Sequence, residues 1–312
     1  PVNNQNKKFG YGTLIIPVAG QRMDSETLFR TLSAISTTCQ INIWPVETGF
    51  AVDGIDLGSG LAQTIEPVKA LMLMGPGVSG YEAGEVWHLL DQRINMPITK
   101  VDVGNMGNVT WSDYNVLVLV NGNYNLDKST TEKIKNWVQQ GGTLITWKGA
   151  SEWAVKQGIT KQKLVAPDTA KKDLRIDFKD AANTEGAKAI GGSIFQVDLD
   201  ITNPIGFGFT DRKVSVYRNG TTCMQPSKLP YANVAVYGSN PLIGGYLHKS
   251  QAKRISNSAA IILSPEGKGR VILFSDNPNF RGIWYGTNRL FLNALFLGNL
   301  INLPSGGGAE GD

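Results

Sequence analysis

Short apolar runs alternate along the first half of the chain with longer segments whose apolar residues recur every three or four positions. The short runs are typical of buried strands, and the longer segments are typical of amphipathic helices. Strands joined by helices of this length form βαβ crossovers, so the pattern predicts an α/β fold with a doubly wound, mainly parallel sheet. The predicted strands lie at residues 69–74, 97–102, 116–120 and 143–147, and the predicted helices at residues 81–94, 129–140 and 151–157.

The second half has a different pattern, because its apolar runs are separated by Gly, Asn and Pro turns. This pattern predicts an additional β-rich segment over residues 161–303, which ends in an amphipathic helix at residues 287–301. The polar stretch up to residue 188 is expected to be a surface connection. The predicted strands of this segment lie at residues 194–199, 213–217, 232–237, 258–263 and 270–275.

The remaining parts of the chain complete the predicted organisation. Residues 1–66 are predicted to form a β-α-β segment packed on the core, with strands at 13–18 and 41–46 on either side of a helix that begins at Asp24. Residues 67–160 are the predicted α/β core. Residues 304–312 have no apolar side chain beyond Ala309 and Pro304, and we expect a disordered tail there.

Composition limits the chemistry that the chain can carry. Of the 312 residues only 2 are His and 2 are Cys, so a closed zinc site would need nearly all four, and a disulfide framework is excluded. The state of Cys39 and Cys223, one disulfide or none, stays open. The net charge of +4 is scattered, and the lysines at 161–163 and 171–172 lack the interleaved aromatics of a nucleic-acid platform. We therefore expect no nucleic-acid partner, and no membrane span because no apolar run approaches ~20 residues.

A glycine-rich loop joins a predicted strand to a predicted helix. Gly75, Gly77 and Gly80 have the GxGxxG spacing of dinucleotide-binding turns. Asp102, 22 residues past Gly80, lies where such folds place the acidic residue that binds the ribose. Two glutamates in the first turn of the helix would, however, put negative charge beside a pyrophosphate. A structural turn is the favoured interpretation, and nucleotide binding through this loop is kept as an alternative function.

The predicted helix at 81–94 carries Glu82, Glu85, His88 and Asp91 at steps of three residues. His88 and Asp91 have the separation of a two-ligand metal pair, but a solvated polar stripe is favoured because no third ligand is assigned. A hydrolase that uses Glu82, His88 and Asp91 is kept as a second alternative, in which His88 supplies the imidazole base.

Two loops at the ends of predicted strands could present reactive or binding groups. The turn after residues 143–147 has the position of a nucleophile elbow, but Trp147 and Lys148 at its tip are not hydrolytic nucleophiles, and Ser151 comes one turn too late. The loop after residues 270–275 includes Asp276 and Arg281. Ligands bind at such positions in open α/β sheets, but these two side chains could equally pair with each other.

Four stretches of the chain together resemble a known family. They are residues 78–99 (VSGYEAGEVWHLLDQRINMPIT), 141–153 (GGTLITWKGASEW), 194–208 (IFQVDLDITNPIGFG) and 267–296. They look like the C-terminal region of bacterial zinc carboxypeptidases, especially large secreted Bacteroidetes forms, in which a class I glutamine amidotransferase-like domain follows the peptidase domain. The resemblance extends over residues 9–303. It implies a flavodoxin-like, amidotransferase-like sheet, a periplasmic or secreted location, and binding to the peptidase domain of the same polypeptide or to a peptide or glycan-derived ligand.

Two departures from that family bear on activity. Its peptidase domain binds zinc through an HxxE motif and a later His, whereas the nearest match here is His88-Leu89-Leu90-Asp91 on a helix of the α/β unit. This chain, which begins at Pro1 without a signal peptide, is therefore expected to lack the peptidase domain and its zinc, and we expect no cofactor in it. Amidotransferases carry Cys in the elbow motif GxCxG, where Trp147 stands here, so glutamine hydrolysis by a Cys–His pair is not expected.

These observations and the resemblance together lead us to expect a non-catalytic accessory domain that binds a partner domain, a peptide or a small ligand. The expected site is the carboxyl edge of the sheet. We assign no catalytic residue and no metal ligand. The expected ligand-binding residues are Ser79, Tyr81, Glu82, Asn121, Asn123, Trp147, Lys148, Asp276 and Arg281.

Overall fold

The computed structural model describes residues 2–4, 7–167, 175, 177–186 and 189–303. The predicted tail at 304–312 and the lysines at 171–172 lie outside the described residues. The chain divides into two compact units, Pro1–Thr64 and Ile65–Asp312, and each is described by itself. Within the described ranges, no helix combines the length and the apolarity needed to cross a membrane.

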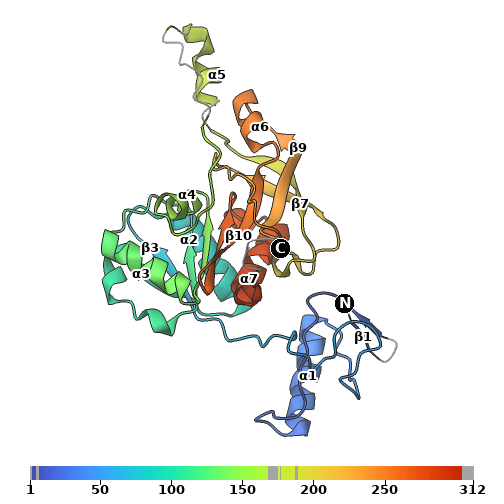
Figure 1. Cartoon of the computed structure of the whole chain (residues 1–312). Coiled ribbons are helices and arrows are strands. Elements are labelled where there is room, and N and C mark those ends of the chain that lie inside the picture. Colours follow the sequence, from blue (N-terminus) through green and yellow to red (C-terminus); the bar gives the residue numbers. More distant parts are fainter. Residues whose placement is uncertain (1, 5–6, 168–174, 176, 187–188, 304–312) are drawn as a thin grey trace, which may run out of the picture. The chain divides into compact units, whose positions relative to one another are not determined.

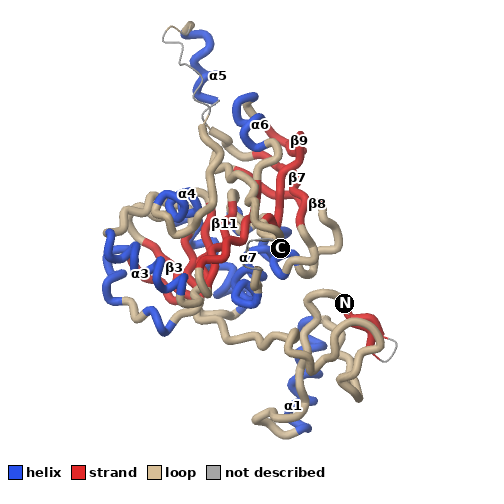
Figure 2. Tube along the Cα trace, viewed as in Figure 1, coloured by secondary structure: helices blue, strands red, loops and turns tan. Residues whose placement is uncertain are grey.

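The first unit contains a short pair of strands and one helix (Figures 1 and 2). Strands β1 (Val2–Asn4) and β2 (Lys7–Phe9) are antiparallel, and helix α1 (Ser25–Cys39) starts where predicted because the Asp24 carboxylate accepts the N–H of Thr27. The strands predicted at 13–18 and 41–46 are wrong, since both runs have no regular secondary structure. Neither run has a paired strand beside it among the described residues of this unit, and a strand without a neighbour is not stable.

The second unit is built on one sheet of nine strands. Its parallel part runs in the order β4, β3, β5, β6 and β11, which is the flavodoxin-like order when these strands are numbered along the chain. The predicted class, a doubly wound α/β fold with a mainly parallel central sheet, is confirmed. These strands are β3 (Ala70–Met74), β4 (Thr99–Asp102), β5 (Val116–Leu119), β6 (Thr143–Trp147) and β11 (Gly269–Phe274).

Four antiparallel strands continue the same sheet beyond β11, in the order β10, β9, β7 and β8. Strand β9 is longer than predicted because β7 pairs with it from residue 235 to residue 245, whereas β10 pairs only with residues 233–236. Strand β11 joins the two parts of the sheet, since it is parallel to β6 on one side and antiparallel to β10 on the other. The bounds are β7 (Ser193–Leu199), β8 (Lys213–Arg218), β9 (Asn233–Gly245) and β10 (Ala259–Glu266).

Helices cover both faces of the parallel strands (Figure 1). Met72 and Ile145 point into a core shared with α2 and α7, whereas their neighbours Leu71 and Leu144 point into a core shared with α3 and α4. Burial on both faces explains why these strands are apolar without alternation. The helices are α2 (Gly80–His88), continued by the π-helical segment Leu89–Ile94, α3 (Lys128–Gln139), α4 (Gly149–Lys156), α5 (Ala181–Gly186), α6 (Lys249–Ile255) and α7 (Asn288–Leu297).

Candidate functional site

The carboxyl ends of the parallel strands bring most of the predicted site residues to one edge of the sheet. Strand β3 leads to Ser79, β5 leads to Asn121 and Asn123, and β6 leads to Lys148. Two backbone hydrogen bonds join the first two segments: Ser79 N donates to Asn121 O at 2.9 Å, and Asn123 N donates to Gly77 O at 2.8 Å. The order of the strands reverses between β3 and β5, and ligands of open α/β sheets bind beside such a reversal.

Lys148 forms the tip of a sharp turn between β6 and α4. Its backbone has φ 54° and ψ −122°, a conformation that costs a non-glycine residue on the order of 1–3 kcal/mol. Gly149 lets the turn pack closely, because a Cβ there would lie 2.6 Å from Gly122 O, and its N–H donates to Asn121 Oδ1 at 3.0 Å. The residue at the elbow tip is therefore Lys148. The family resemblance had matched the elbow cysteine one position earlier, to Trp147.

The side chain of Lys148 is held in a buried ion pair. Its Nζ lies 2.7 Å from Glu82 Oε1 and 3.0 Å from Asn219 Oδ1, and Lys148 and Glu82 are only 7% and 6% exposed. The other carboxylate oxygen of Glu82 accepts hydrogen bonds from Trp147 Nε1 at 2.6 Å and from Asn121 N at 3.3 Å. Buried charges persist when they are paired and hydrogen-bonded, and both charges meet that condition here. The structure thus brings four of the predicted residues into one network.

A second carboxylate, that of Glu85, ties helix α2 to the loop after β11. Its oxygens accept the side-chain N–H of Asn277 at 2.6 Å and the backbone N–H of Arg281 at 2.6 Å. Burial raises the pKa of Glu85 and the negative charge of Glu82 adds to the rise, whereas the two hydrogen bonds oppose it. The three-residue spacing of Glu82 and Glu85 was visible in the sequence, but the partner of Glu85, 192 residues away, was not.

The rim of this edge is open to solvent. Tyr81 at the start of α2 is 91% exposed, and Asn123 and Arg281 are also exposed. Arg281 has φ 50°, and its guanidinium makes no ion pair with another residue in the described part of the chain. The edge therefore has a closed charged centre and an open polar and aromatic rim.

Asp276 does not belong to that rim. Its carboxylate is paired with the fully buried Arg218, whose Nη1 lies 2.9 Å from Asp276 Oδ1, and it also accepts the hydroxyl hydrogen bond of Tyr237. Burial raises the pKa of Tyr237, and the carboxylate of Asp276 adds to the rise. A pair between Asp276 and Arg281 is therefore wrong, because the strand order places Arg218 at the end of β8 beside Asp276. We assign Asp276 a structural role.

The three residues of the alternative hydrolase are not brought together. Glu82 is buried against Lys148, whereas His88 and Asp91 are exposed. Glu82 and His88 are six positions apart, which is about 9 Å along a helix, and proton transfer needs a contact of about 3 Å. Beyond His88 the helix changes to the π-helical segment Leu89–Ile94, so Asp91 no longer follows the α-helical spacing of the earlier residues.

The described residues contain no group of three or more His, Cys, Asp or Glu that is arranged to hold a metal ion. The two cysteines are both free thiols. Cys39 is exposed and Cys223 is buried. Neither lies at the elbow.

The loop at residues 75–80 is a closely packed turn. Gly75 has φ 106°, and a Cβ there would lie 2.2 Å from Asp102 Oδ2. Gly77 has φ 85°, and a Cβ there would lie 2.6 Å from Asn123 O. Close packing therefore explains why glycine occupies both positions. The carboxylate of Asp102 next to Gly75 puts negative charge beside the loop, which disfavours a pyrophosphate there.

Comparisons with known proteins give similarities at low sequence identity. No protein-family model matches the chain, and none of the curated proteins matches it significantly. A ThuA-like protein from Parabacteroides merdae is 16% identical, with a TM-score of 0.47, over 77% of this chain and 92% of its own. A ThuA-like protein from Bacteroides uniformis is 12% identical, with a TM-score of 0.46, over 73% of this chain and 89% of its own. A GMP synthase subunit from Thermoplasma acidophilum is 13% identical, with a TM-score of 0.42, over 75% of this chain and 94% of its own.

The resemblance to a zinc carboxypeptidase is wrong. No family model of that kind matches the chain, and the similar structures named above are ThuA-like proteins and one component of a GMP synthase. The stretches that carried the resemblance form helix α2, strand β7 and the strand-to-helix segments that begin with β6 and β11. Such elements are common to α/β sheets of many families. Activity does not transfer at identities and TM-scores of this size, so function has to be argued from the site itself.

Proposed function

We propose that this chain is a non-catalytic binding domain that recognises an acidic peptide segment of a partner protein at the carboxyl edge of its sheet. One observation carries the proposal. The elbow tip, where an elbow presents a reactive side chain, holds Lys148 in a buried ion pair with Glu82.

The ion pair argues against a nucleophilic role for Lys148. A lysine attacks a substrate through the lone pair of its neutral amine. The ammonium of Lys148 instead donates hydrogen bonds to Glu82 and Asn219, and an ammonium has no lone pair. The exposed His88 lies too far along α2 to act as its base. We therefore assign the buried pair of Lys148 and Glu82 a structural role and no catalytic role.

The open rim supports binding. Tyr and Arg are enriched at protein interfaces, because each offers a large contact area together with directed hydrogen bonds. Tyr81 and Arg281 offer both. Tyr81 directly precedes Glu82 and is exposed, and the exposed Arg281 is held near α2 by its backbone hydrogen bond to Glu85. A guanidinium binds a carboxylate through two parallel hydrogen bonds, so the unpaired Arg281 fits an Asp or Glu of the partner segment.

Two measurements on the full chain test the proposal. The rates of ammonia release from glutamine and of p-nitrophenyl ester hydrolysis are expected to be no higher in the wild type than in the double variant Glu82→Gln/Lys148→Met, which removes both charges of the buried ion pair. Fluorescence anisotropy with a labelled peptide of alternating Glu and Tyr is expected to show binding that weakens as salt rises. Arg281→Gln should weaken it roughly three- to tenfold, the effect of an exposed charge pair worth about 0.7–1.4 kcal/mol.

Lys213→Gln is the matched control, since it removes one exposed positive charge on β8. It should leave peptide binding within about twofold. An equal loss in both variants would mean that the peptide responds to net charge alone. Turnover that is present in the wild type and absent from the folded double variant Glu82→Gln/Lys148→Met would show that the elbow is catalytic. Either result overturns the proposal.

A hydrolase is the second candidate. It is favoured by the strained backbone of Lys148 and the raised pKa of Glu85, because strain and perturbed carboxyl groups gather at catalytic sites. In that case Glu85, and not His88, would be the acid. The same turnover assays decide between the candidates: activity that is present in the wild type and lost in Glu85→Gln would establish the hydrolase.

A further inference from the structure

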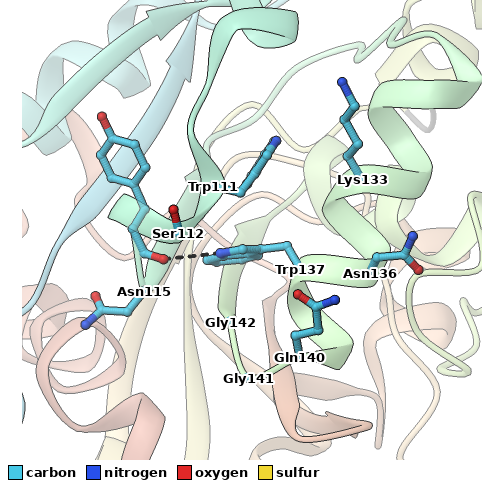
Figure 3. Close-up of a pocket in the computed structure, with 10 residues that line it drawn as sticks. Trp111, Ser112, Asn115, Lys133, Asn136, Trp137, Gln140, Gly141 and Gly142 are labelled. Carbon is cyan, nitrogen blue, oxygen red and sulfur yellow. Dashed lines mark hydrogen bonds between the residues drawn. The ribbon is translucent and has the colours of Figure 1, made fainter.

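A surface pocket lies at the edge of the parallel sheet opposite to the elbow (Figure 3). Its volume is about 430 Å³, within the roughly 300–1,000 Å³ range of small-molecule sites. Asn115 and Gly142, which line it, directly precede strands β5 and β6, so the pocket faces the amino ends of these strands. It is therefore separate from the proposed peptide site.

Two indole rings form one part of the pocket, and the fold fixes their positions. Trp111, in the short helical turn Trp111–Asp113, and Trp137, in α3, have ring centroids 5.7 Å apart at an angle of 51°. Trp137 Nε1 donates to Tyr114 O at 3.2 Å, which Figure 3 shows as a dashed line. A Cβ at Gly142 would lie 2.5 Å from the ring of Trp137, so glycine makes room for it. These contacts fix the ring of Trp137, which is only 8% exposed, so the half-buried Trp111 offers more of its indole to a ligand.

Uncharged polar groups and one cation form the other part of the pocket. Lys133, Asn136 and Gln140 come from α3 and its end, at spacings that put them on one side of the helix (Figure 3). Ser112 adds a hydroxyl group. In the described parts of the chain the side chains of these four residues have no hydrogen-bond partner, so their donors and acceptors are free for a ligand. None of the described lining residues is acidic, which argues against a cationic ligand.

We propose that this pocket binds a pyranose sugar. The C–H groups on one face of a pyranose ring are weakly positive, and they pack against the negative face of an indole. The hydroxyl groups around the ring both donate and accept hydrogen bonds, as the amides of Asn136 and Gln140 also do. Lys133 adds a partner for an acidic substituent such as the carboxylate of a uronic acid. A flat nucleobase would also stack on indole, and the test below distinguishes it from a sugar.

Isothermal titration of the full chain tests the proposal with defined probes. The probes are the methyl pyranosides of glucose, galactose and mannose, N-acetylglucosamine, glucuronic acid and, for comparison, adenosine. At least one sugar is expected to bind with a dissociation constant near ~1 mM, as for small polar ligands of shallow sites. Trp111→Ala should weaken the binding of that sugar by roughly tenfold or more, and Gln140→Ala should weaken it by about threefold.

Gln140→Ala keeps the test decisive if Trp111→Ala fails to fold, because Gln140 is exposed at the end of α3. Trp87→Ala is the matched control, since Trp87 is a half-exposed tryptophan of α2, outside the pocket. It should leave sugar affinity unchanged. The proposal fails if no sugar binds at about 50 mM, if Gln140→Ala and Trp87→Ala have the same effect, or if adenosine binds in a Trp111-dependent manner while the sugars do not.

Discussion

Replacing Lys148 by methionine is expected to destabilise the second unit strongly. The carboxylate of Glu82, only 6% exposed, would stay buried and would lose the ammonium that lies 2.7 Å away. Removal of one partner from a buried ion pair costs about 3–5 kcal/mol. The hydrogen bonds from Trp147 Nε1 and Asn121 N to Glu82 would persist. They place the expected loss at the lower end of that range, about 3 kcal/mol.

The double variant Glu82→Gln/Lys148→Met separates loss of the ion pair from loss of packing. It removes both charges, and the glutamine amide keeps an acceptor for Trp147 Nε1. Replacement of both partners of a buried pair is often close to neutral, so the double variant should lie within about 1–2 kcal/mol of the wild type. The double variant should then be about 1–2 kcal/mol more stable than Lys148→Met alone.

Urea unfolding followed by far-UV circular dichroism measures these differences, and thermal melts provide a second measure. A loss of about 3 kcal/mol should lower the melting temperature by about 6–12 °C in a domain of this size. The reasoning is refuted if Lys148→Met costs less than about 1 kcal/mol, or if the double variant is no more stable than the single one.

Glu85, Gly142 and the two cysteines should respond to simple perturbations. Burial raises the pKa of Glu85 in the folded state, so this group favours folding below its ordinary pKa of 4.5 and loses that contribution as pH rises through the raised pKa. The stability of the wild type relative to Glu85→Gln should therefore fall as pH rises above 4.5 in urea titrations, and a flat difference would contradict this. Gly142→Ala should lower the free energy of unfolding by about 1–3 kcal/mol, because the added Cβ would lie 2.5 Å from the ring of Trp137. Gly84→Ala is the control, since Gly84 in α2 has open space around it, and it should be neutral or stabilising. Similar unfolding midpoints for the two variants would contradict the packing argument. Burial also raises the pKa of the Cys223 thiol, which lowers its reactivity. A thiol reagent should therefore modify the exposed Cys39 rapidly and Cys223 only in urea. Rapid reaction of both cysteines in the folded protein would contradict this.

The parallel core was predictable because its strands are buried on both faces. Strand β6 has the predicted bounds, Thr143–Trp147, and β5 ends one residue earlier than predicted. The run at residues 13–18 is equally apolar but forms no strand. Strand formation depends on a neighbour that supplies hydrogen bonds, and this neighbour is a non-local feature that local patterning does not reveal.

The candidate site was predictable in position but not in its pairings. Residues that follow parallel strands converge at one edge, which is why Asn121 and Lys148 lie near Glu82 as expected. The partner of Asp276 is Arg218, 58 residues earlier, and this pair depends on where the antiparallel strands join the sheet. The positive φ of Lys148 could not be predicted from the sequence either, because lysine has no preference for that conformation.

The position of β11 in the middle of the sheet has a consequence for the order of folding. Its parallel partner β6 ends at residue 147, but β11 starts only at residue 269. During synthesis, β6 is therefore an edge strand with unpaired backbone groups until most of the chain has left the ribosome. Exposed edges of this kind pair readily with other chains. Strand β6, which in the complete sheet lies beside the central strand, is thus the segment through which an unfinished chain would aggregate.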